Sequence, residues 1–538
     1  MDAPAPADTN RSATDPQDSV IPVAVIDVGT ASIRMAIAEI GPGDHVRPLE
    51  RLSQAVSLGR DTFTKGIIEK PTIEECVRVL KSYRQVLREY QIVQDDRIRI
   101  VATSAVREAG NRMAFLDRVY SATGMRIEPI DEAEVNRITY LGIQPFLRSE
   151  EALARANTVI IEVGGGSTEL LLVQQGEVAY SRTFRLGSLR LRQMLDSYRA
   201  PAGKVRSIME SQIRRTVEEV VQHVPRDGTV EMIALGGDIR FAANQILPDW
   251  NRNELATVPV AELETFTDRV LTLSEDRLIQ QYHLTYRDAE MLGPALLTYL
   301  RLSAELGLQR IQVTNVNLRD GLLTEMAHRG IWTDEFFNQV LRSALNLGRK
   351  FDFDEQHAWH VAELCKKLFR ALQQEHRLNP RYELMLYIAA LLHEIGLYIS
   401  YRSYHKHSMY LILNSELFGL GRKDVMLVAL AARYHRRASP KPSHDGYASL
   451  NVEHRIAVSK MAAILRVADA LDDSRSQRVR GIECICEDSR LVISVPHVED
   501  LSMEQLALKQ KGSLFEEIFG MQVLLRTVRN ARENGPVL

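Results

Sequence analysis

The sequence is poor in cysteine, in net charge and in long apolar runs, and each scarcity excludes a class of protein. Only four cysteines occur in 538 residues, with no CxxC pair, which predicts free thiols in a reducing cytoplasm. The net charge of −3 gives no strong field toward nucleic acid or an anionic membrane. The most apolar stretch, residues 384–399, is interrupted by two polar residues and is too short to cross a bilayer. We expect a soluble, cytoplasmic protein that binds neither nucleic acid nor membrane.

The length and patterning predict several domains in one chain. A chain of 538 residues with 45% hydrophobic residues is large enough for about three or four domains. Strand-like and helical stretches alternate up to about residue 330, and helical periodicity dominates beyond it. We expect a disordered tail over 1–20, α/β domains over 21–145 and 146–330, a helical domain over 331–478, and an α+β subdomain over 479–538.

A glycine-rich hairpin over residues 158–173 is the strongest local signal. Two apolar runs are joined by Gly164, Gly165, Gly166, Ser167 and Thr168. Backbone amides of such a loop can approach a phosphate closely, and hydroxyls add donors. Glu162 and Glu169, at the two margins, could hold a divalent cation or activate a water. The alternative is a tight hairpin turn with solvated ends.

A similar unit precedes it, over residues 23–38. An apolar run is followed by Asp27, Gly29, Thr30 and Ser32 and then by a second apolar run. A repeated strand, acid, glycine, hydroxyl and strand unit indicates duplicated halves. We therefore predict two phosphate loops that face each other across a cleft.

These hairpins, together with four other segments, resemble the exopolyphosphatase and guanosine pentaphosphate phosphatase family. The other segments are ATSAVREA at 102–109, RLG at 185–187, RDAE at 287–290 and LRDGL at 318–322. The resemblance extends from residue 21 to the C-terminus. It implies a duplicated actin-like (ribonuclease H-like) two-domain ATPase core, an all-α HD-type domain and a small α+β subdomain. It also implies a homodimer formed through the helical region.

The resemblance implies a phosphohydrolase that releases terminal orthophosphate from inorganic polyphosphate or guanosine pentaphosphate (pppGpp) with Mg²⁺. The implied Mg²⁺ ligands are Asp27, Glu162 and Glu169, whose carboxylates suit this ion. Glu134 would activate the water, with Glu162 and Glu169 assisting. The residues expected to bind phosphate are Thr30, Ser32, Arg107, Gly164, Gly165, Gly166, Ser167, Thr168, Gly236 and Gly237, with Arg34 as a further candidate.

Four positions depart from the family pattern. Counted back from Gly142, the family's catalytic glutamate falls on Val135, and Glu134 is one residue away, which on a helix is a rotation of about 100°. The other departures are Ala31, Glu162 and Asp238. They favour an alternative hypothesis, a catalytically weakened regulatory protein that binds polyphosphate or nucleotide. A third hypothesis, an ATP-dependent kinase, lacks an acceptor-sugar signature.

The helical region contains a second set of candidate residues. The HD-type cluster comprises His357, His393, Glu394, His435 and Asp469. Glu394 stands where HD hydrolases have aspartate, so either a metal site or histidines satisfied in a helical core or facing a phosphate channel would explain the cluster. A cationic cluster suits either a polyphosphate path or a solvated helix face. It comprises Arg402, His405, Lys406, His407, Arg433, Arg436, Arg437 and Lys441.

Overall fold

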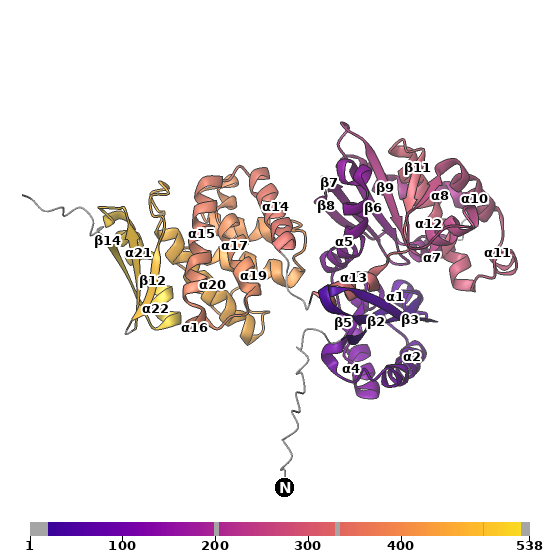
Figure 1. The fold of residues 1–538 in the computed structure, drawn as a ribbon, viewed down its shortest axis with the longest axis horizontal. Coiled ribbons are helices and arrows are strands. Elements are labelled where there is room, and N and C mark those ends of the chain that lie inside the picture. The colour runs from indigo at the N-terminus through magenta and orange to yellow at the C-terminus, as the bar shows by residue number, and fades with distance from the viewer. Residues whose placement is uncertain (1–19, 198–203, 329–333, 488, 529–538) are drawn as a thin grey trace, which may run out of the picture. The chain divides into compact units, whose positions relative to one another are not determined.

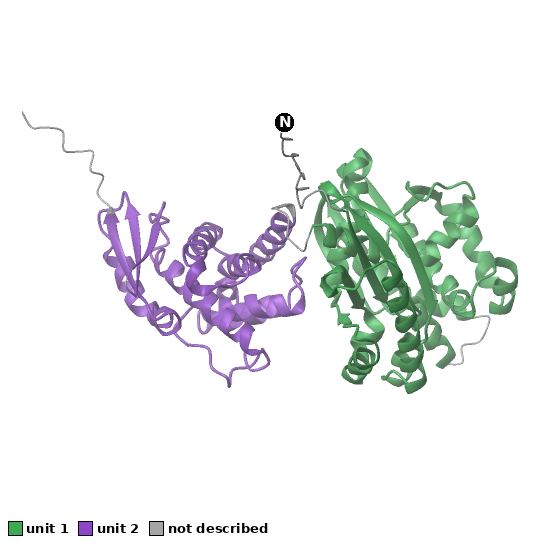
Figure 2. Cartoon of the chain, turned by 60° about the horizontal axis from the view of Figure 1, so that its bottom comes forward, with its two compact units in different colours: residues 1–331 green, residues 332–538 purple. Residues whose placement is uncertain are grey.

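The computed structural model describes residues 20–197, 204–328, 334–487 and 489–528. The chain divides into two compact units, residues 1–331 and residues 332–538, which Figure 2 shows in different colours. The predicted disordered tail lies outside the described residues except for Val20. Among the described helices, none combines the length and the apolarity that crossing a membrane requires. All four cysteines are free, as predicted.

The first half of unit 1 contains a five-stranded mixed sheet in the order β3-β2-β1-β4-β5. β1, β2 and β3 form an antiparallel meander, and β4 and β5 add in parallel next to β1. The strands are β1 (Ile21–Val28), β2 (Ser32–Ile40), β3 (Val46–Ala55), β4 (Ile98–Ala102) and β5 (Glu128–Pro129). β1 is almost entirely buried because it lies at the centre of the sheet.

The second half repeats this plan in a six-stranded sheet, β8-β7-β6-β9-β11-β10 (Figure 1). Its strands are β6 (Asn157–Val163), β7 (Thr168–Gln174), β8 (Glu177–Phe184), β9 (Val230–Leu235), β10 (Ala256–Pro259) and β11 (Arg310–Val313). β6, β7 and β8 are antiparallel, and β9 and β11 follow in parallel, with β10 antiparallel at the edge. The predicted duplicated α/β core is therefore confirmed.

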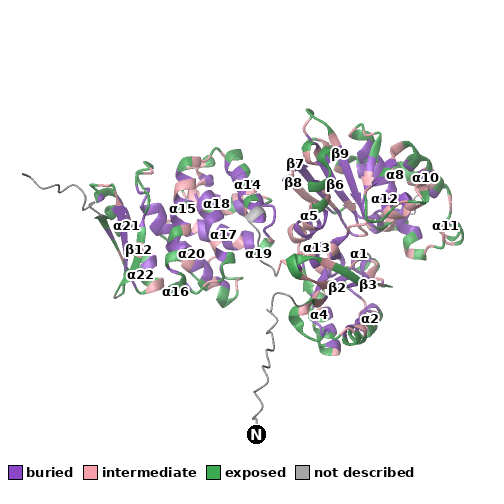
Figure 3. Ribbon diagram, viewed as in Figure 1, coloured by how far each residue is buried: buried purple, intermediate pink, exposed green. Residues whose placement is uncertain are grey.

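Helices cover these sheets and bury their apolar faces, as Figure 3 shows by colour. The first half contributes α1 (Leu58–Lys65), α2 (Lys70–Glu89), α3 (Ser104–Glu108), α4 (Arg112–Thr123) and α5 (Glu132–Ser149). The second contributes α6 (Glu151–Arg155), α7 (Ser188–Ser197), α8 (Val205–Val221), α9 (Gly237–Ile246), α10 (Val260–Thr272), α11 (Glu275–Tyr282) and α12 (Tyr286–Glu305). α13 (Leu318–Ala327) returns to α5, where Gly321 is required because a Cβ there would collide with the Ile138 carbonyl.

Unit 2 is a helical body followed by a small sheet. Its helices are α14 (Asp334–Lys350), α15 (Glu355–Ala371), α16 (Gln373–His376), α17 (Arg381–Leu392), α18 (Tyr404–Leu413), α19 (Arg422–Arg433) and α20 (Val452–Ala470). The sheet has the order β12-β13-β14, formed by β12 (Glu483–Glu487), β13 (Arg490–Pro496) and β14 (Gln522–Val528), and is accompanied by α21 (Ser502–Lys511) and α22 (Ser513–Phe519). α17 is buried along nearly its whole length, since it packs against α15, α19 and α20.

Candidate active site

The first glycine hairpin is the turn between β1 and β2. Its backbone closes through a 3.0 Å hydrogen bond from the Gly29 amide to the Ser32 carbonyl. The strand register places Asp27 opposite Arg34. Asp27 is buried, and its Oδ1 has no hydrogen-bond partner among the described residues. Because an unpaired buried carboxylate oxygen is costly, this atom is suited to a cation or to a donor on a bound ligand.

The second hairpin, between β6 and β7, has the same geometry. The Gly164 amide donates to the Ser167 carbonyl at 2.8 Å, and the register places Glu162 opposite Glu169. In the repeat, Glu162 therefore corresponds to the acid of the first hairpin, and Glu169 corresponds to Arg34. One hairpin thus presents an acid and a cation at its margins, whereas the other presents two acids.

The two hairpins contact each other through the loops that the sequence predicted to be opposed. Thr30 Oγ1 lies 3.3 Å from Ser104 Oγ, at the start of α3. A Cβ on Gly165 would lie 3.0 Å from Thr30 Cγ2, and a Cβ on Gly166 would collide with Ser104 and Phe63. Only glycine allows the second loop to approach this closely. The acids of both hairpins therefore belong to one site.

Burial dominates the electrostatics of these acids. It raises the pKa of Asp27 and of Glu162, although neighbouring arginines partly compensate. Burial and the charge of Glu162 raise the pKa of Glu169 to about 7. Asp238, at the start of α9, also has its pKa raised to about 7 by burial and by Asp288. The pKa values of these acids are therefore all raised, and a bound cation would favour their ionised forms.

Three arginines supply positive charge to this group. Arg319 Nη1 lies 3.6 Å from Asp27 Oδ2. Arg240 lowers the pKa of Glu162, and Arg34 lowers that of both acids. Burial lowers the pKa of Arg240 and Arg319, but guanidinium groups stay charged in proteins. Of the three, Arg34 alone was a sequence candidate. Arg319 lies in the LRDGL segment, which could have signalled it, and Arg240 lacked any such signal.

The predicted phosphate-binding residues divide into two groups. The Thr168 hydroxyl donates to the Leu186 carbonyl, and Ser167 Oγ donates to Glu169 Oε1 at 2.5 Å. These two hydroxyls hydrogen-bond within the protein in this structure, and their role in binding phosphate stays a prediction. The loop glycines and Thr30 remain at the junction of the hairpins, and Ser32 closes the first turn.

Two further predicted elements lie close to the same acids. Arg107 donates from Nη1 to the Ile130 carbonyl at 3.0 Å, and its charge lowers the pKa of Glu169. Gly236, with φ of 119°, caps α9 and could not carry a Cβ without pressing on the Tyr299 hydroxyl. A Cβ on Gly237 would meet nothing within 4 Å, so this glycine faces open space. Gly236 and Gly237, which form the third loop, therefore contribute to the site through their backbone.

Glu134, in the first turn of α5, lies in an ion-pair network. Its carboxylate makes a bidentate ion pair with Arg137, at 2.9 and 2.8 Å, and lies 3.3 Å from Arg99. Both arginines also pair with Glu325 on α13. Val135 is buried in the core between β1 and α13. In this structure Glu134 is therefore held by two arginines, and its role in activating the water stays a prediction.

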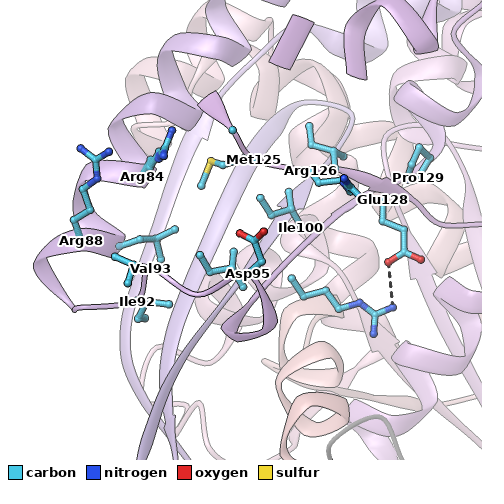
Figure 4. A pocket seen from close by; sticks show the side chains of 15 residues that line it. Arg84, Arg88, Ile92, Val93, Asp95, Ile100, Met125, Arg126, Glu128 and Pro129 are labelled. Carbon is cyan, nitrogen blue, oxygen red and sulfur yellow. Dashed lines mark ion pairs between the residues drawn. The ribbon is translucent and has the colours of Figure 1, made fainter. Parts of the chain in front are cut away.

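A cavity of about 670 Å³ is lined in part by Arg99 of that network, and Figure 4 shows its lining. Apolar side chains such as Ile92, Ile100 and Met125 form part of its lining, together with several arginines, among them Arg84 and Arg88. It contains none of the predicted site residues. This cavity is therefore separate from the hairpin site.

The structure brings the HD-type cluster of unit 2 together. His357 Nε2 lies 3.9 Å from Glu394 Oε2 and 3.7 Å from Asp469 Oδ1. The His393 ring lies 4.9 Å from the His435 ring, centroid to centroid. The Asp469 and Asp472 carboxylates raise the pKa of His357 to about 9 against the opposing effect of burial. In contrast, burial and His393 keep the pKa of His435 well below its usual value.

The cationic cluster of unit 2 lies on α18 and just before it, and on the end of α19 and the segment after it. The Arg436 guanidinium stacks 4.7 Å from the centre of the Tyr404 ring. Burial, together with Arg436 and Lys406, lowers the pKa of His405 to about 4, so this ring is neutral at physiological pH. The exposed aromatic rings of Tyr401 and Tyr410 lie on and beside the same helix. The cluster combines positive charge with aromatic surface, a composition suited to anionic ligands.

Comparisons with known proteins match both units. A model of the Ppx/GppA phosphatase family matches residues 36–330, and a model of domain III of Ppx/GppA phosphatases matches residues 341–510. An exopolyphosphatase structure from Cytophaga hutchinsonii is similar, with 20% identity, a TM-score of 0.51, and coverage of 57% of this chain and 98% of its own. A Ppx/GppA family member from Aquifex aeolicus has 21% identity, a TM-score of 0.49, and coverage of 59% of this chain and 100% of its own.

Proposed function

Because the chain belongs to the Ppx/GppA phosphatase family, we propose that it hydrolyses the terminal phosphoanhydride of inorganic polyphosphate, of guanosine pentaphosphate, or of both. The observation that supports this proposal is the pair of matched glycine hairpins whose loops touch beside a buried group of acids and arginines. Two such loops suit two successive phosphates of a chain end, since each offers backbone amides to an anion.

Different residues of the site would bind the phosphoryl group and activate the water. Arg34, Arg240 and Arg319 would pair with phosphoryl oxygens, whose charge the buried arginines are suited to balance. Glu169, with a pKa of about 7, would take the proton from the attacking water, because a base works best when its pKa lies near the operating pH.

The acids also fit a divalent cation. Asp27 Oδ1 is buried and has no hydrogen-bond partner among the described residues, and the charge of Asp27 raises the pKa of Glu162, so these two carboxylates would be the ligands of Mg²⁺. Such an ion neutralises charge on the phosphoryl oxygens.

The direct test is release of orthophosphate from long-chain polyphosphate and from guanosine pentaphosphate, with Mg²⁺ and no acceptor. We expect release by the wild type and its loss in Glu169→Gln. Glu264→Gln, on the exposed face of α10, is the matched control and should keep full activity. Equal activity in wild type and Glu169→Gln would overturn the assignment of the base.

A catalytically weakened binding protein is the second candidate. Val135, buried in the core, stands where the family has its catalytic glutamate, and Asp238 adds an acid to the third loop. Binding of polyphosphate without release by the wild type would support this candidate. If the wild type neither binds polyphosphate nor releases phosphate from it, both candidates are contradicted.

A further inference from the structure

Two histidines in the interior of unit 2 direct an unpaired ring nitrogen toward a common centre. His357 lies on α15, and His393 directly follows α17. They are 2% and 0% exposed, and in the described part of the chain neither Nε2 has a hydrogen-bond partner. Their ring centroids are 5.6 Å apart. Two buried, unpaired nitrogens so close together are costly unless something binds between them.

The other ring nitrogen of each histidine is held by an acceptor. His357 Nδ1 lies 2.8 Å from Asp472 Oδ2, and His393 Nδ1 lies 2.6 Å from the Ala390 carbonyl. Because a carboxylate and a carbonyl can only accept, each Nδ1 donates its proton to that partner, and Nε2 is the atom left to bind a metal, which would displace any proton held there. This arrangement is the one that orients histidines that ligate metals.

Two carboxylates complete the centre. Asp469 on α20 places Oδ1 3.7 Å from Nε2 of His357 and also 3.7 Å from Nε2 of His393. Glu394 Oε2 lies 3.9 Å from His357 Nε2, and one donor atom each from His357, His393 and Glu394 all lie within 4.8 Å of one another. These separations are too long for hydrogen bonds but suit donors arranged around an ion at bonds of about 2.0–2.2 Å after small shifts.

The surrounding ion-pair network has an excess of negative charge. Arg475 pairs with Glu394 at 2.5 Å, and Lys511 pairs with Asp469 Oδ2 at 2.8 Å, so Oδ1 of Asp469 faces the histidines. The network comprises the carboxylates of Asp354, Glu394, Asp469, Asp472 and Asp473 and the cations Arg475 and Lys511. Acids outnumber permanent cations, which leaves charge for a dication to balance.

We propose that unit 2 binds a first-row transition-metal dication, such as Zn²⁺ or Mn²⁺, through His357 Nε2, His393 Nε2 and Asp469 Oδ1, with Glu394 as a further ligand. Two imidazoles favour such an ion over Mg²⁺ or Ca²⁺, which prefer oxygen ligands. The ion would join α15, the end of α17 and α20. His435 is not a ligand in this arrangement, because its Nε2 lies 3.2 Å from the Tyr404 hydroxyl.

The test uses the full-length chain, dialysed against a chelator and titrated with Co²⁺, whose visible absorption reports its ligands. We expect stoichiometric binding by the wild type and a loss of affinity of about 100-fold or more in His393→Gln. His376→Gln is the matched control, since His376 is buried in the same unit but both its ring nitrogens are hydrogen-bonded. Glu162→Gln separates this site from any ion bound in unit 1, and it should leave the histidine-dependent absorption unchanged.

Two results would overturn the proposal. The first is Co²⁺ absorption that is the same in wild type and His393→Gln. The second is no Co²⁺ binding by the wild type. If His393→Gln does not fold, Glu394→Gln, at the more accessible edge of the cluster, replaces it and should weaken Co²⁺ binding at least about tenfold.

Discussion

Buried carboxylates occur in both units, yet their pKa values shift in opposite directions. In the hairpin site, burial and Glu162 raise the pKa of Glu169 to about 7. In unit 2, Asp469 is also removed from solvent, but its pKa falls well below the ordinary value because His357 and His393 more than offset the desolvation. The two histidines thus stabilise the ionised form of Asp469, whereas the arginines only partly offset the burial of the hairpin acids. Buried acids with raised pKa values are typical of functional sites.

The largest effect that this comparison predicts is on catalysis. Glu169→Gln removes the proposed base, so phosphate release should fall about 10²- to 10⁴-fold. The folded state should be no less stable, because the substitution removes a buried acid that is repelled by Glu162. Phosphate release and urea unfolding of the same preparation measure both effects. A large loss of stability would show that Glu169 is compensated within the protein after all.

The opposite result is expected in unit 2. Asp469→Asn removes a carboxylate that interacts with His357, His393 and Lys511. Because the partners stay buried without their counter-charge, the free energy of unfolding should fall by about 3 kcal/mol. Urea denaturation followed by circular dichroism measures this change. An unchanged urea midpoint would show that Asp469, like Glu169, does not stabilise the folded state.

The contributions of the two sites to stability should change with pH in opposite directions. The Glu169 carboxyl has a folded-state pKa of about 7, against an ordinary value of 4.5. Between these two pH values the unfolded chain ionises while the folded one stays protonated, so stability should fall as pH rises, by about 3 kcal/mol in total. Glu169→Gln should remove this slope. Asp469 contributes in the opposite sense, because its stabilisation is present above pH 3.8 and is lost only at lower pH.

The sequence predicted the hairpins because their signals are local. Asp27 and Glu162 are each two residues before the glycine that closes the turn, so strand register alone fixes their place. The duplication of the sheets followed from the same repeat. Arg240 could not be found in this way, since it reaches the site only through the packing of α9 against the sheet. Contacts between distant elements have no local signature.

The ion pairs of Glu134 depend on a contact between distant elements that the sequence does not show. An acid at the start of α5 can face either the hairpins or α13, and one residue of helix phase decides which. α13 comes from the far end of unit 1 and carries Glu325, which pairs with Arg99 and Arg137. Those arginines also bind Glu134. The packing of α13 against α5 therefore determines which ion pairs surround Glu134.

The smallest effect predicted is that of Glu134→Gln. Loss of its ion pairs with Arg137 and Arg99 should lower the free energy of unfolding by about 1–2 kcal/mol, because Glu325 still pairs with both arginines. Phosphate release should stay within twofold of the wild type, since the carboxylate is held in the ion-pair network. Urea unfolding and the phosphate assay measure the two effects together. A loss of activity comparable with that of Glu169→Gln, without loss of stability, would return Glu134 to the reaction and show that α5 changes phase when substrate binds.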